Sequence, residues 1–153
     1  MRQIKSQNTS PELRVRRVVR ELGHTGYRLH RKDLPGKPDM AWIGRKLAIF
    51  IHGCFWHGHT CRRGARVPKT RVEYWTAKIE RNRARDAKHE AELLAAGWRC
   101  ITLWECELKD GDIIAKRLQD FFSGLQSKQA LVYKPTEESE IKPAKLKSSR
   151  YSI

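Results

Sequence analysis

Four side chains able to bind a soft metal ion constrain the fold of this chain more than any other feature of its sequence. Cys54, His59 and Cys61 lie within eight residues of one another, and Cys106 follows much later in the chain. Three thiolates and an imidazole suit a closed, tetrahedral zinc site. The alternative is a set of reduced, partly buried thiols that hold no metal. If zinc is bound, the residues around position 54 must pack against those around position 106.

The net charge points to a polyanionic partner. The 153 residues include 32 Lys and Arg against 17 Asp and Glu, a formal net charge of +15. Such a chain attracts phosphate groups, as nucleases, ribosomal proteins and basic membrane-surface proteins all do. It has no apolar run long enough to span a membrane and no apolar signal segment after Met1. We therefore expect a cytosolic protein whose four cysteines are thiols or metal ligands rather than disulfides.

Hydrophobic periodicity predicts an α/β fold with a mixed sheet between helices. The first helix begins with Ser10 as N-cap before Pro11 and ends near Gly23. Two apolar runs separated by Gly44 and Arg45 predict a β-hairpin, and an almost wholly apolar third run predicts a central strand. The expected elements are a helix at 10–22, strands at 38–43, 46–51 and 98–104, a long helix at 73–96 and a last helix at 113–122.

The chain divides into one domain and a tail. Residues 1–126 hold all the expected elements, and their length suits one domain with one core. Residues 127–153 are rich in Lys, Ser, Glu and Pro and contain few large apolar side chains. We expect them to form a basic, disordered tail.

The hairpin brings a carboxylate and two histidines to one edge of the sheet. A turn at residues 44–45 places Asp39 opposite residues 50–52. If the zinc ligands are committed to that metal, His52 and His57 stay free. A carboxylate suits Mg²⁺, and a neutral imidazole can take a proton from water near pH 7. The alternative is that Asp39 only caps a strand and that both histidines are surface residues.

Aromatic side chains follow these histidines and recur in the basic helix. Phe55 and Trp56 lie in a loop crowded with polar residues, and Trp75 begins the helix. Aromatic side chains at a basic surface can stack on bases or wedge between base steps. Lys78 and Asn82 share the helix face of Trp75 and can hydrogen-bond a base or a phosphate. The residues expected in the core instead are Trp42, Trp98, Trp104 and Cys100.

Four blocks of sequence, taken in order, resemble the very short patch repair endonucleases. They are 34–39 (LPGKPD), 50–57 (FIHGCFWH), 68–71 (PKTR) and 104–106 (WEC), and the block GCFWH is highly specific. The resemblance runs from Met1 to about Phe122. It implies a restriction-endonuclease-like α/β fold, with a central mixed β-sheet flanked by helices and a structural zinc site. It also implies Mg²⁺-dependent nicking of double-stranded DNA 5′ to the thymine of a T·G mismatch, which arises when 5-methylcytosine deaminates.

The resemblance implies a role for individual residues as well. Asp39 would bind Mg²⁺ together with the backbone carbonyl of Ile51, and His57 would activate the attacking water. The supporting catalytic residues would be His52, Asp86 and Glu12. The structural zinc would be held by Cys54, His59, Cys61 and Cys106. Contacts to DNA beside the mismatch would come from Phe55, Trp56, Trp75, Lys78, Asn82, Met1 and Ile4.

Two features depart from the family pattern. Ile51 stands where Thr is usual, a change that keeps a carbonyl ligand and removes a hydroxyl. The chain begins at Met1, where relatives carry several more polar and basic residues. Either the start lies upstream or recognition from the minor groove is weaker in this chain.

The expectation is a cytoplasmic, nucleoid-associated monomer that acts on double-stranded DNA containing a T·G mismatch, with other repair proteins as possible partners. Two alternatives remain. One is a restriction-like nuclease that acts on other DNA, and the other is a non-catalytic, zinc-stabilised DNA-binding module. The sequence does not indicate the bases preferred around the mismatch, the identity of repair partners or the role of the tail.

Overall fold

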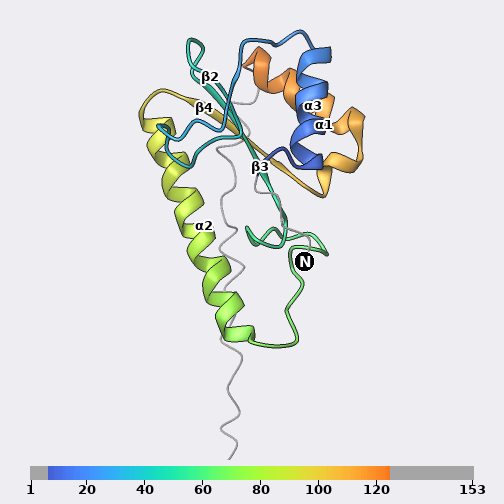
Figure 1. Ribbon diagram of the computed structural model, residues 1–153, viewed down its shortest axis with the longest axis vertical. Coiled ribbons are helices and arrows are strands. Elements are labelled where there is room, and N and C mark those ends of the chain that lie inside the picture. The colour runs from blue at the N-terminus through green and yellow to red at the C-terminus, as the bar shows by residue number, and fades with distance from the viewer. Residues whose placement is uncertain (1–6, 125–153) are drawn as a thin grey trace, which may run out of the picture.

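A computed structural model describes residues 7–124 of the chain. Met1, Ile4 and the expected tail at 127–153 lie outside the described residues. The elements in chain order are α1 (Ser10–Glu21), β1 (Arg28–Leu29), β2 (Met40–Trp42), β3 (Leu47–His52), α2 (Val72–Ala95), β4 (Arg99–Trp104), the 3₁₀ helix η1 (Glu107–Lys109) and α3 (Gly111–Ser123). Figure 1 shows the sheet crossed by α2 on one side and by α1 and α3 on the other.

The sheet is mixed, as expected. Its strand order is β1-β2-β3-β4, with antiparallel pairing from β1 to β3 and parallel pairing between β3 and β4. The expected central position of residues 98–104 is wrong, because β4 forms an edge of the described sheet and β3 is internal. The apolar character of β4 has another cause. Helices pack on both of its faces, so it is shielded by helices rather than by two neighbouring strands.

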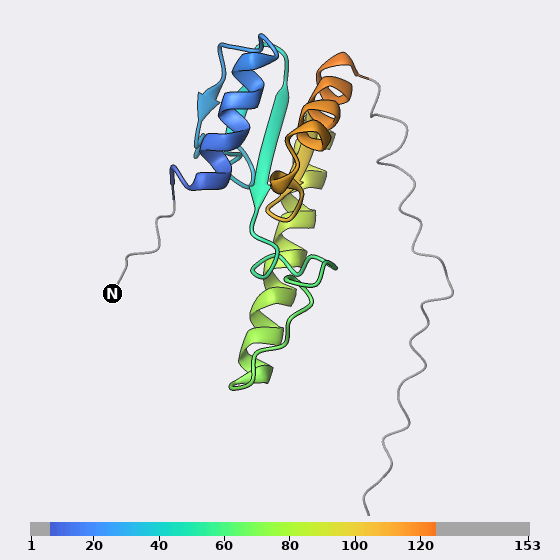
Figure 2. The same cartoon turned by 90° about the vertical axis from the view of Figure 1, so that its right-hand side faces the viewer.

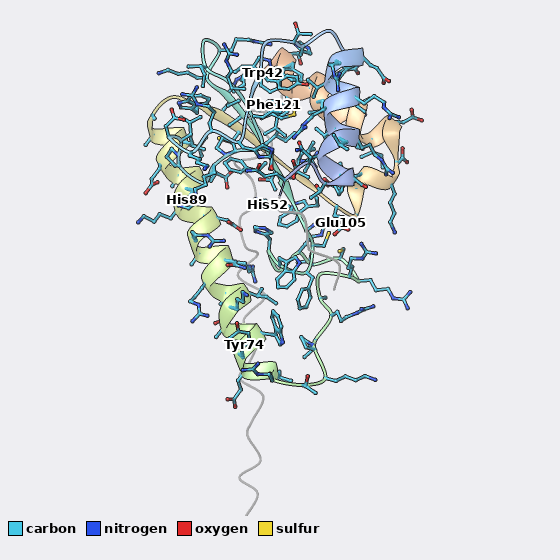
Figure 3. The ribbon with its side chains drawn as sticks, viewed as in Figure 1. Trp42, His52, Tyr74, His89, Glu105 and Phe121 are labelled. Atoms are coloured by element: carbon cyan, nitrogen blue, oxygen red, sulfur yellow. The ribbon has the colours of Figure 1, made fainter. Side chains whose placement is uncertain are left out.

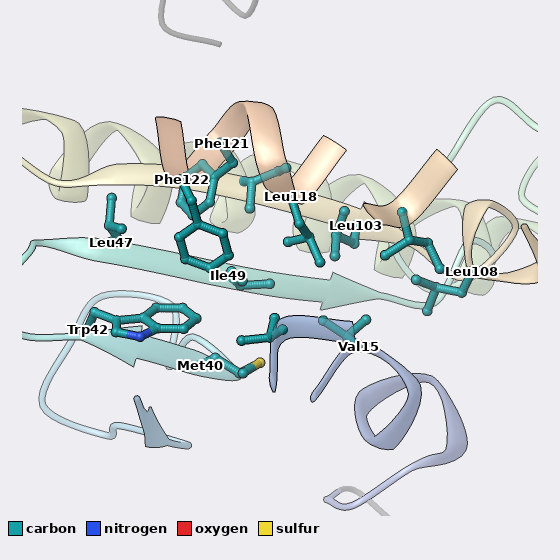
Figure 4. Close-up of a cluster of buried hydrophobic side chains, with 13 residues drawn as sticks. Val15, Met40, Trp42, Leu47, Ile49, Leu103, Leu108, Leu118, Phe121 and Phe122 are labelled. Carbon is teal, nitrogen blue, oxygen red and sulfur yellow. The ribbon is translucent and has the colours of Figure 1, made fainter. Parts of the chain in front are cut away.

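Alternation along the strands divides the core into two clusters. The larger cluster packs the sheet against α1 and α3, and Figure 4 shows Leu118, Phe121 and Phe122 of α3 facing Ile49 and Trp42. The smaller cluster lies on the α2 side of the sheet; it comprises Ala41, Ala48, Phe50, Leu93 and Trp98. Because side chains alternate between faces, His52 and Trp104 share the α2 face with Phe50.

The N-cap of the first helix lies one residue earlier than expected. Thr9 is the N-cap, and its hydroxyl accepts a hydrogen bond from the Glu12 N–H at 3.4 Å. The Glu12 carboxylate in turn accepts a hydrogen bond from the Thr9 hydroxyl at 3.1 Å. Ser10 is therefore the first helical residue rather than the cap. Thr9 and Glu12 have the three-residue spacing of a capping box. This signal sets the N-cap at Thr9, although Ser10 before Pro11 had indicated Ser10.

The hairpin and the long helix position the candidate site. Met40 pairs with Ile49, so Asp39 comes next to Phe50 as the sequence predicts. Helix α2 ends at Ala95, and Gly97 adopts a left-handed φ of +83° just after it. In both views the N-terminal half of α2 extends past the sheet, beside the loop that follows β3 (Figures 1 and 2). No helix among residues 7–124 is both long and apolar enough to cross a membrane.

Candidate active site and metal centre

The four expected zinc ligands meet just beyond the end of β4. The ligand atoms of Cys54, His59, Cys61 and Cys106 all lie within 4.8 Å of one another. The Cys106 N–H donates to Cys54 Sγ at 3.4 Å, and Cys106 Sγ lies 3.5 Å from His59 Nδ1. The ring of Trp104 stacks on His59 with centroids 4.4 Å apart. These contacts join two segments that are distant in the sequence.

The surroundings of this cluster fit a bound cation. A Cβ at Gly64 would lie 2.1 Å from the His59 carbonyl oxygen, so only glycine lets the loop close around the cluster. Burial raises the pKa of the Cys54 thiol to about 12. Hydrogen bonds, first from the Gly64 N–H and then from His59, lower the pKa of Cys61 to about 6. A cation would stabilise both thiolates, and three sulfurs with one nitrogen suit Zn²⁺.

Asp39 lies where the hairpin strands open at one edge of the sheet. Its Oδ2 accepts a hydrogen bond from the Ile51 N–H at 2.7 Å. The N–H and C=O of a strand residue point to the same side, so the Ile51 carbonyl also faces Asp39. Burial raises the pKa of Asp39 to about 6, and the charge of Glu12 adds to this against the hydrogen bond from Ile51. A carboxylate and a carbonyl oxygen are ligands that Mg²⁺ prefers.

Glu12 is buried and lies beside Asp39, which is half-buried, in a group of titratable side chains. The carboxylates of Glu12 and Asp39 and the His30 imidazole have ligand atoms within 4.8 Å of one another. Glu12 is 5% exposed, and its Oε2 accepts a hydrogen bond from Arg16 Nη2 at 3.1 Å. Sequence reasoning missed Arg16 and His30. The Glu-Arg pair at i, i+4 was a signal for Arg16, whereas His30 follows a two-residue strand that left no pattern.

His57 and Asp86 form a hydrogen-bonded pair between the loop and α2. His57 Nδ1 lies 2.5 Å from Asp86 Oδ2. If Asp86 is ionised, Nδ1 carries the proton and the Nε2 lone pair is free to accept one from water. Burial raises the pKa of Asp86, but the hydrogen bond and charge of His57 outweigh it, and the net pKa is lowered. The carboxylate is therefore ionised near neutral pH.

His52 supports this pair through its ring. It stacks on His57 with centroids 3.8 Å apart and planes 6° from parallel. Burial, and then the charge of His57, lowers the pKa of His52 to about 4, so the ring is neutral near pH 7. Figure 3 places His52 at the end of β3, between α2 and the loop. A neutral, stacked ring holds the plane of His57 without competing for its proton.

One cleft of about 570 Å³ brings the expected catalytic groups together. Four of the five expected catalytic residues line it, namely Asp39, His52, His57 and Asp86, together with the expected Mg²⁺ ligand Ile51. Glu12 is not among the residues that line the cleft. Four further basic or imidazole side chains line the same cleft, namely Lys32, Lys37, Arg85 and His89. The Asp39 carboxylate and the His57 imidazole thus line the same cleft. Basic side chains around it suit a phosphodiester.

The expected DNA-contacting aromatics gather beside the cleft. Phe55, Trp56 and Trp75 have ring centroids between 5.2 and 6.0 Å apart. Lys78 Nζ lies 5.4 to 5.9 Å from the centroids of Trp56, Trp75 and Tyr74, the last of which sequence reasoning missed. Trp56 remains 42% exposed. A large ring left in water beside a basic helix suits contact with bases.

The expectation of core positions for three other tryptophans is partly wrong. Trp42 and Trp98 are buried, at 4% and 9% exposure. Trp104 is only half-buried and packs against His52 and His59. It lies at the end of β4, where the strand leaves the core and reaches the cluster of Cys and His side chains. Cys100 packs against the smaller core cluster, as expected.

Comparison with known proteins decides the family. The family model described as DNA mismatch endonuclease Vsr matches residues 1–63. The chain is 52% identical over 120 residues to the type II nicking enzyme V.XorIIP of Xanthomonas oryzae pv. oryzae, covering 78% of this chain and 87% of that protein. It is 35% identical over 129 residues to DNA mismatch endonuclease Vsr of Escherichia coli K12, covering 81% of each. The chain belongs to the Vsr family.

The Vsr assignment agrees with the fold. The catalytic domain of the homing endonuclease I-Bth0305I superposes with a TM-score of 0.51 over 76% of this chain and 97% of that one, at 24% identity. That likeness concerns the fold, and it confirms the expected nuclease architecture of a mixed sheet flanked by helices. As a Vsr protein, the chain is a DNA endonuclease. The Cys and His cluster next to β4 is a candidate metal centre of this Vsr chain.

Proposed function

We propose that this protein nicks double-stranded DNA 5′ to the thymine of a T·G mismatch left by deamination of 5-methylcytosine. One observation carries the proposal. A single cleft presents the Asp39 carboxylate and the His57–Asp86 pair, and the exposed Trp56 lies on the loop that carries His57. The E. coli relative, named as a mismatch endonuclease, supports the substrate. We further propose that the protein acts as a monomer in the cytoplasm, on the nucleoid, with or without other repair proteins.

His57 would activate the attacking water. Asp86 accepts the Nδ1 proton of His57, which directs the free Nε2 lone pair toward a water molecule. His52 keeps the ring in plane by stacking. The proton lost by water would pass to His57 as the new P–O bond forms, and the 3′ oxygen would leave. Glu12 would act from the first turn of α1, as a second carboxylate beside Asp39.

Asp39 and the Ile51 carbonyl would hold Mg²⁺. When bound, Mg²⁺ supplies positive charge to the phosphate and the departing oxygen. The donor set fits because the Asp39 carboxylate and the Ile51 carbonyl oxygen lie on the same side of β3. In addition, no lysine or arginine within residues 7–124 forms an ion pair with the Asp39 carboxylate. Cys54, His59, Cys61 and Cys106 would hold a structural Zn²⁺ that fixes the His57 loop against the end of β4.

The aromatics would recognise the mismatch. A T·G pair is displaced from Watson–Crick geometry, so unstacking a neighbouring step costs less there. Phe55, Trp56 and Trp75 would enter such a step, and Lys78 and Asn82 would hydrogen-bond the exposed bases. Met1 and Ile4 would add contacts from the N-terminal segment.

A strand-specific nicking assay tests the proposal. We expect Mg²⁺-dependent cleavage of a T·G duplex and much slower cleavage of the matched T·A duplex. Equal rates on both would favour a restriction-like nuclease acting on other DNA. His57→Ala should lower the rate about 10²–10⁴-fold while DNA affinity without Mg²⁺ is kept. Cleavage that survives both His57→Ala and Asp39→Ala would exclude this cleft as the active site. A wild-type protein that binds the duplex but cleaves neither duplex with Mg²⁺ would instead be a DNA-binding module.

A further inference from the structure

Arg85 is the cationic side chain next to Asp86 in the sequence. Despite burial, and after the hydrogen bond and charge of His57 and the charge of His52, its charge adds to the lowering of the pKa of Asp86. Arg85 precedes Asp86 on α2 and lines the cleft together with Asp39 and His57. Its side chain is exposed, and it forms no ion pair with a carboxylate within residues 7–124. A guanidinium left in this state presents donors that match phosphate oxygens in a two-pronged geometry. Its position is that of a phosphate ligand at the cleft.

A single amide ties this guanidinium to the aromatic loop. Asn82 Oδ1 accepts a hydrogen bond from Arg85 Nη2 at 3.1 Å. The Nδ2 of the same Asn82 donates to the Trp56 carbonyl oxygen at 2.9 Å. Asn82 therefore uses both ends of its side chain, one on the loop and one on the cleft. A shift of the Trp56 backbone must either break the hydrogen bond between Asn82 and the Trp56 carbonyl or move the Asn82 side chain with it. Either change disturbs the hydrogen bond between Asn82 and Arg85.

We propose that Arg85 binds a backbone phosphate of the DNA strand in the cleft, and that Asn82 makes this contact depend on the position of the Trp56 loop. Without an inserted ring, Asn82 holds Arg85 on α2. When Trp56 enters a base step, its carbonyl moves, Asn82 is released toward the bases, and Arg85 is free to reach the phosphate. The inference rests on the proposed mismatch function and adds a link between recognition and cleavage.

Arg85→Gln tests the phosphate contact. We expect single-turnover nicking of the T·G duplex to fall about tenfold to a hundredfold, and the slope of log affinity against log salt to fall by about one. Lys88→Gln is the matched control, since it removes the same charge from the same helix at a residue that does not line the cleft. The control should keep the nicking rate. An Arg85→Gln protein with unchanged rate and slope overturns the contact.

A double-variant cycle tests the link. Asn82→Ala and Arg85→Gln should each lower the ratio of T·G to T·A nicking rates, because the Arg85 contact forms only when Trp56 is inserted. The Asn82→Ala/Arg85→Gln protein should show no lower ratio than the worse single variant. If the fold-losses in this ratio multiply in the double variant, Asn82 and Arg85 act independently and the link is overturned. Failure of the proposed function itself looks different, because the wild-type protein would then nick both duplexes equally. In that case the link is also overturned, and the salt slope of Arg85→Gln still decides the phosphate contact.

Discussion

Asp39 lowers the stability of the metal-free protein in the ionised form that would bind a cation. The carboxyl is partly buried beside a second carboxylate, Glu12, and its pKa is raised to about 6 by burial. An acid whose pKa is higher in the folded than in the unfolded chain contributes most stability below its ordinary pKa of 3.8. That contribution is lost as the pH rises through 6. At neutral pH the free protein therefore carries a destabilising charge that a cation would neutralise.

Asp39→Asn should consequently make the Mg²⁺-free protein more stable and inactive. Asn resembles the protonated acid and can still accept a hydrogen bond from the Ile51 N–H. We expect the free energy of unfolding at pH 8 to rise by about 1–2 kcal/mol, with the gain shrinking toward pH 4. Urea unfolding across this range measures it. A gain that does not vary with pH, or a loss at pH 8, would contradict the buried-charge interpretation.

At the scale of elements, periodicity identified the helices and the hairpin but not every boundary. The apolar stripe of α1, the glycine after α2 and the Gly44-Arg45 turn are local signals, and the structure follows them closely. The edge position of β4 was missed because burial by helices and burial by strands give the same apolar pattern. The two-residue strand β1 is too short for any period to mark.

The candidate site was predictable where chemistry-bearing residues cluster in sequence. The zinc set and the two free histidines lie within ten residues, apart from Cys106. His30 was missed as a site residue because it reaches Glu12 and Asp39 only through a tertiary contact. Arg16 and Tyr74 were missed although each contacts a residue one turn away on its own helix, Glu12 and Lys78 respectively. Asn82 was assigned to bases, and nothing in the sequence shows that it also bonds the Trp56 carbonyl.

The loop that carries His57 should depend on the zinc ligands. Cys106→Ser should lower bound zinc from about one per chain to well below that, and should lower the free energy of unfolding by roughly 2 kcal/mol or more. Elemental analysis and urea unfolding measure the two effects. Cys100→Ser is the matched control, because Cys100 lies in the same strand region but outside the cluster. Full zinc content in the Cys106→Ser protein would exclude this centre.

The exposed Trp56 ring on the same loop should affect discrimination between mismatched and matched DNA more than it affects the affinity for DNA in general. Trp56→Ala should lower the ratio of T·G to T·A nicking about tenfold or more, since a base–aromatic stack contributes about 1–3 kcal/mol. Affinity for matched DNA, measured by fluorescence anisotropy, should change less than threefold. Val67→Ala, at another exposed apolar side chain before α2, should change neither. Equal losses in affinity and ratio would mean a general contact instead of a wedge.

At the scale of the whole molecule, most of the positive charge belongs to the nuclease domain. Residues 127–153 contain six Lys and Arg against three Glu, a small part of the formal +15. The core described within residues 7–124 extends to the end of α3, where Phe121 and Phe122 are buried and Gly124 caps the helix with a left-handed φ of +78°. Both the fold and the electrostatic attraction to DNA are therefore expected from the first 126 residues.

A protein ending at residue 126 should accordingly fold, bind zinc and nick a T·G duplex. We expect its free energy of unfolding to match that of the full chain within about 0.5 kcal/mol, since every core residue described within residues 7–124 is kept. The slope of log affinity against log salt should fall by no more than about three, because each phosphate that the protein no longer neutralises changes it by about 0.9. A truncation after residue 119 is the contrasting control, because it removes Phe121 and Phe122 and should not fold. If the 1–126 protein kept its stability but lost mismatch preference, residues 127–153 would have to take part in recognition, and the domain boundary proposed for this chain would be wrong.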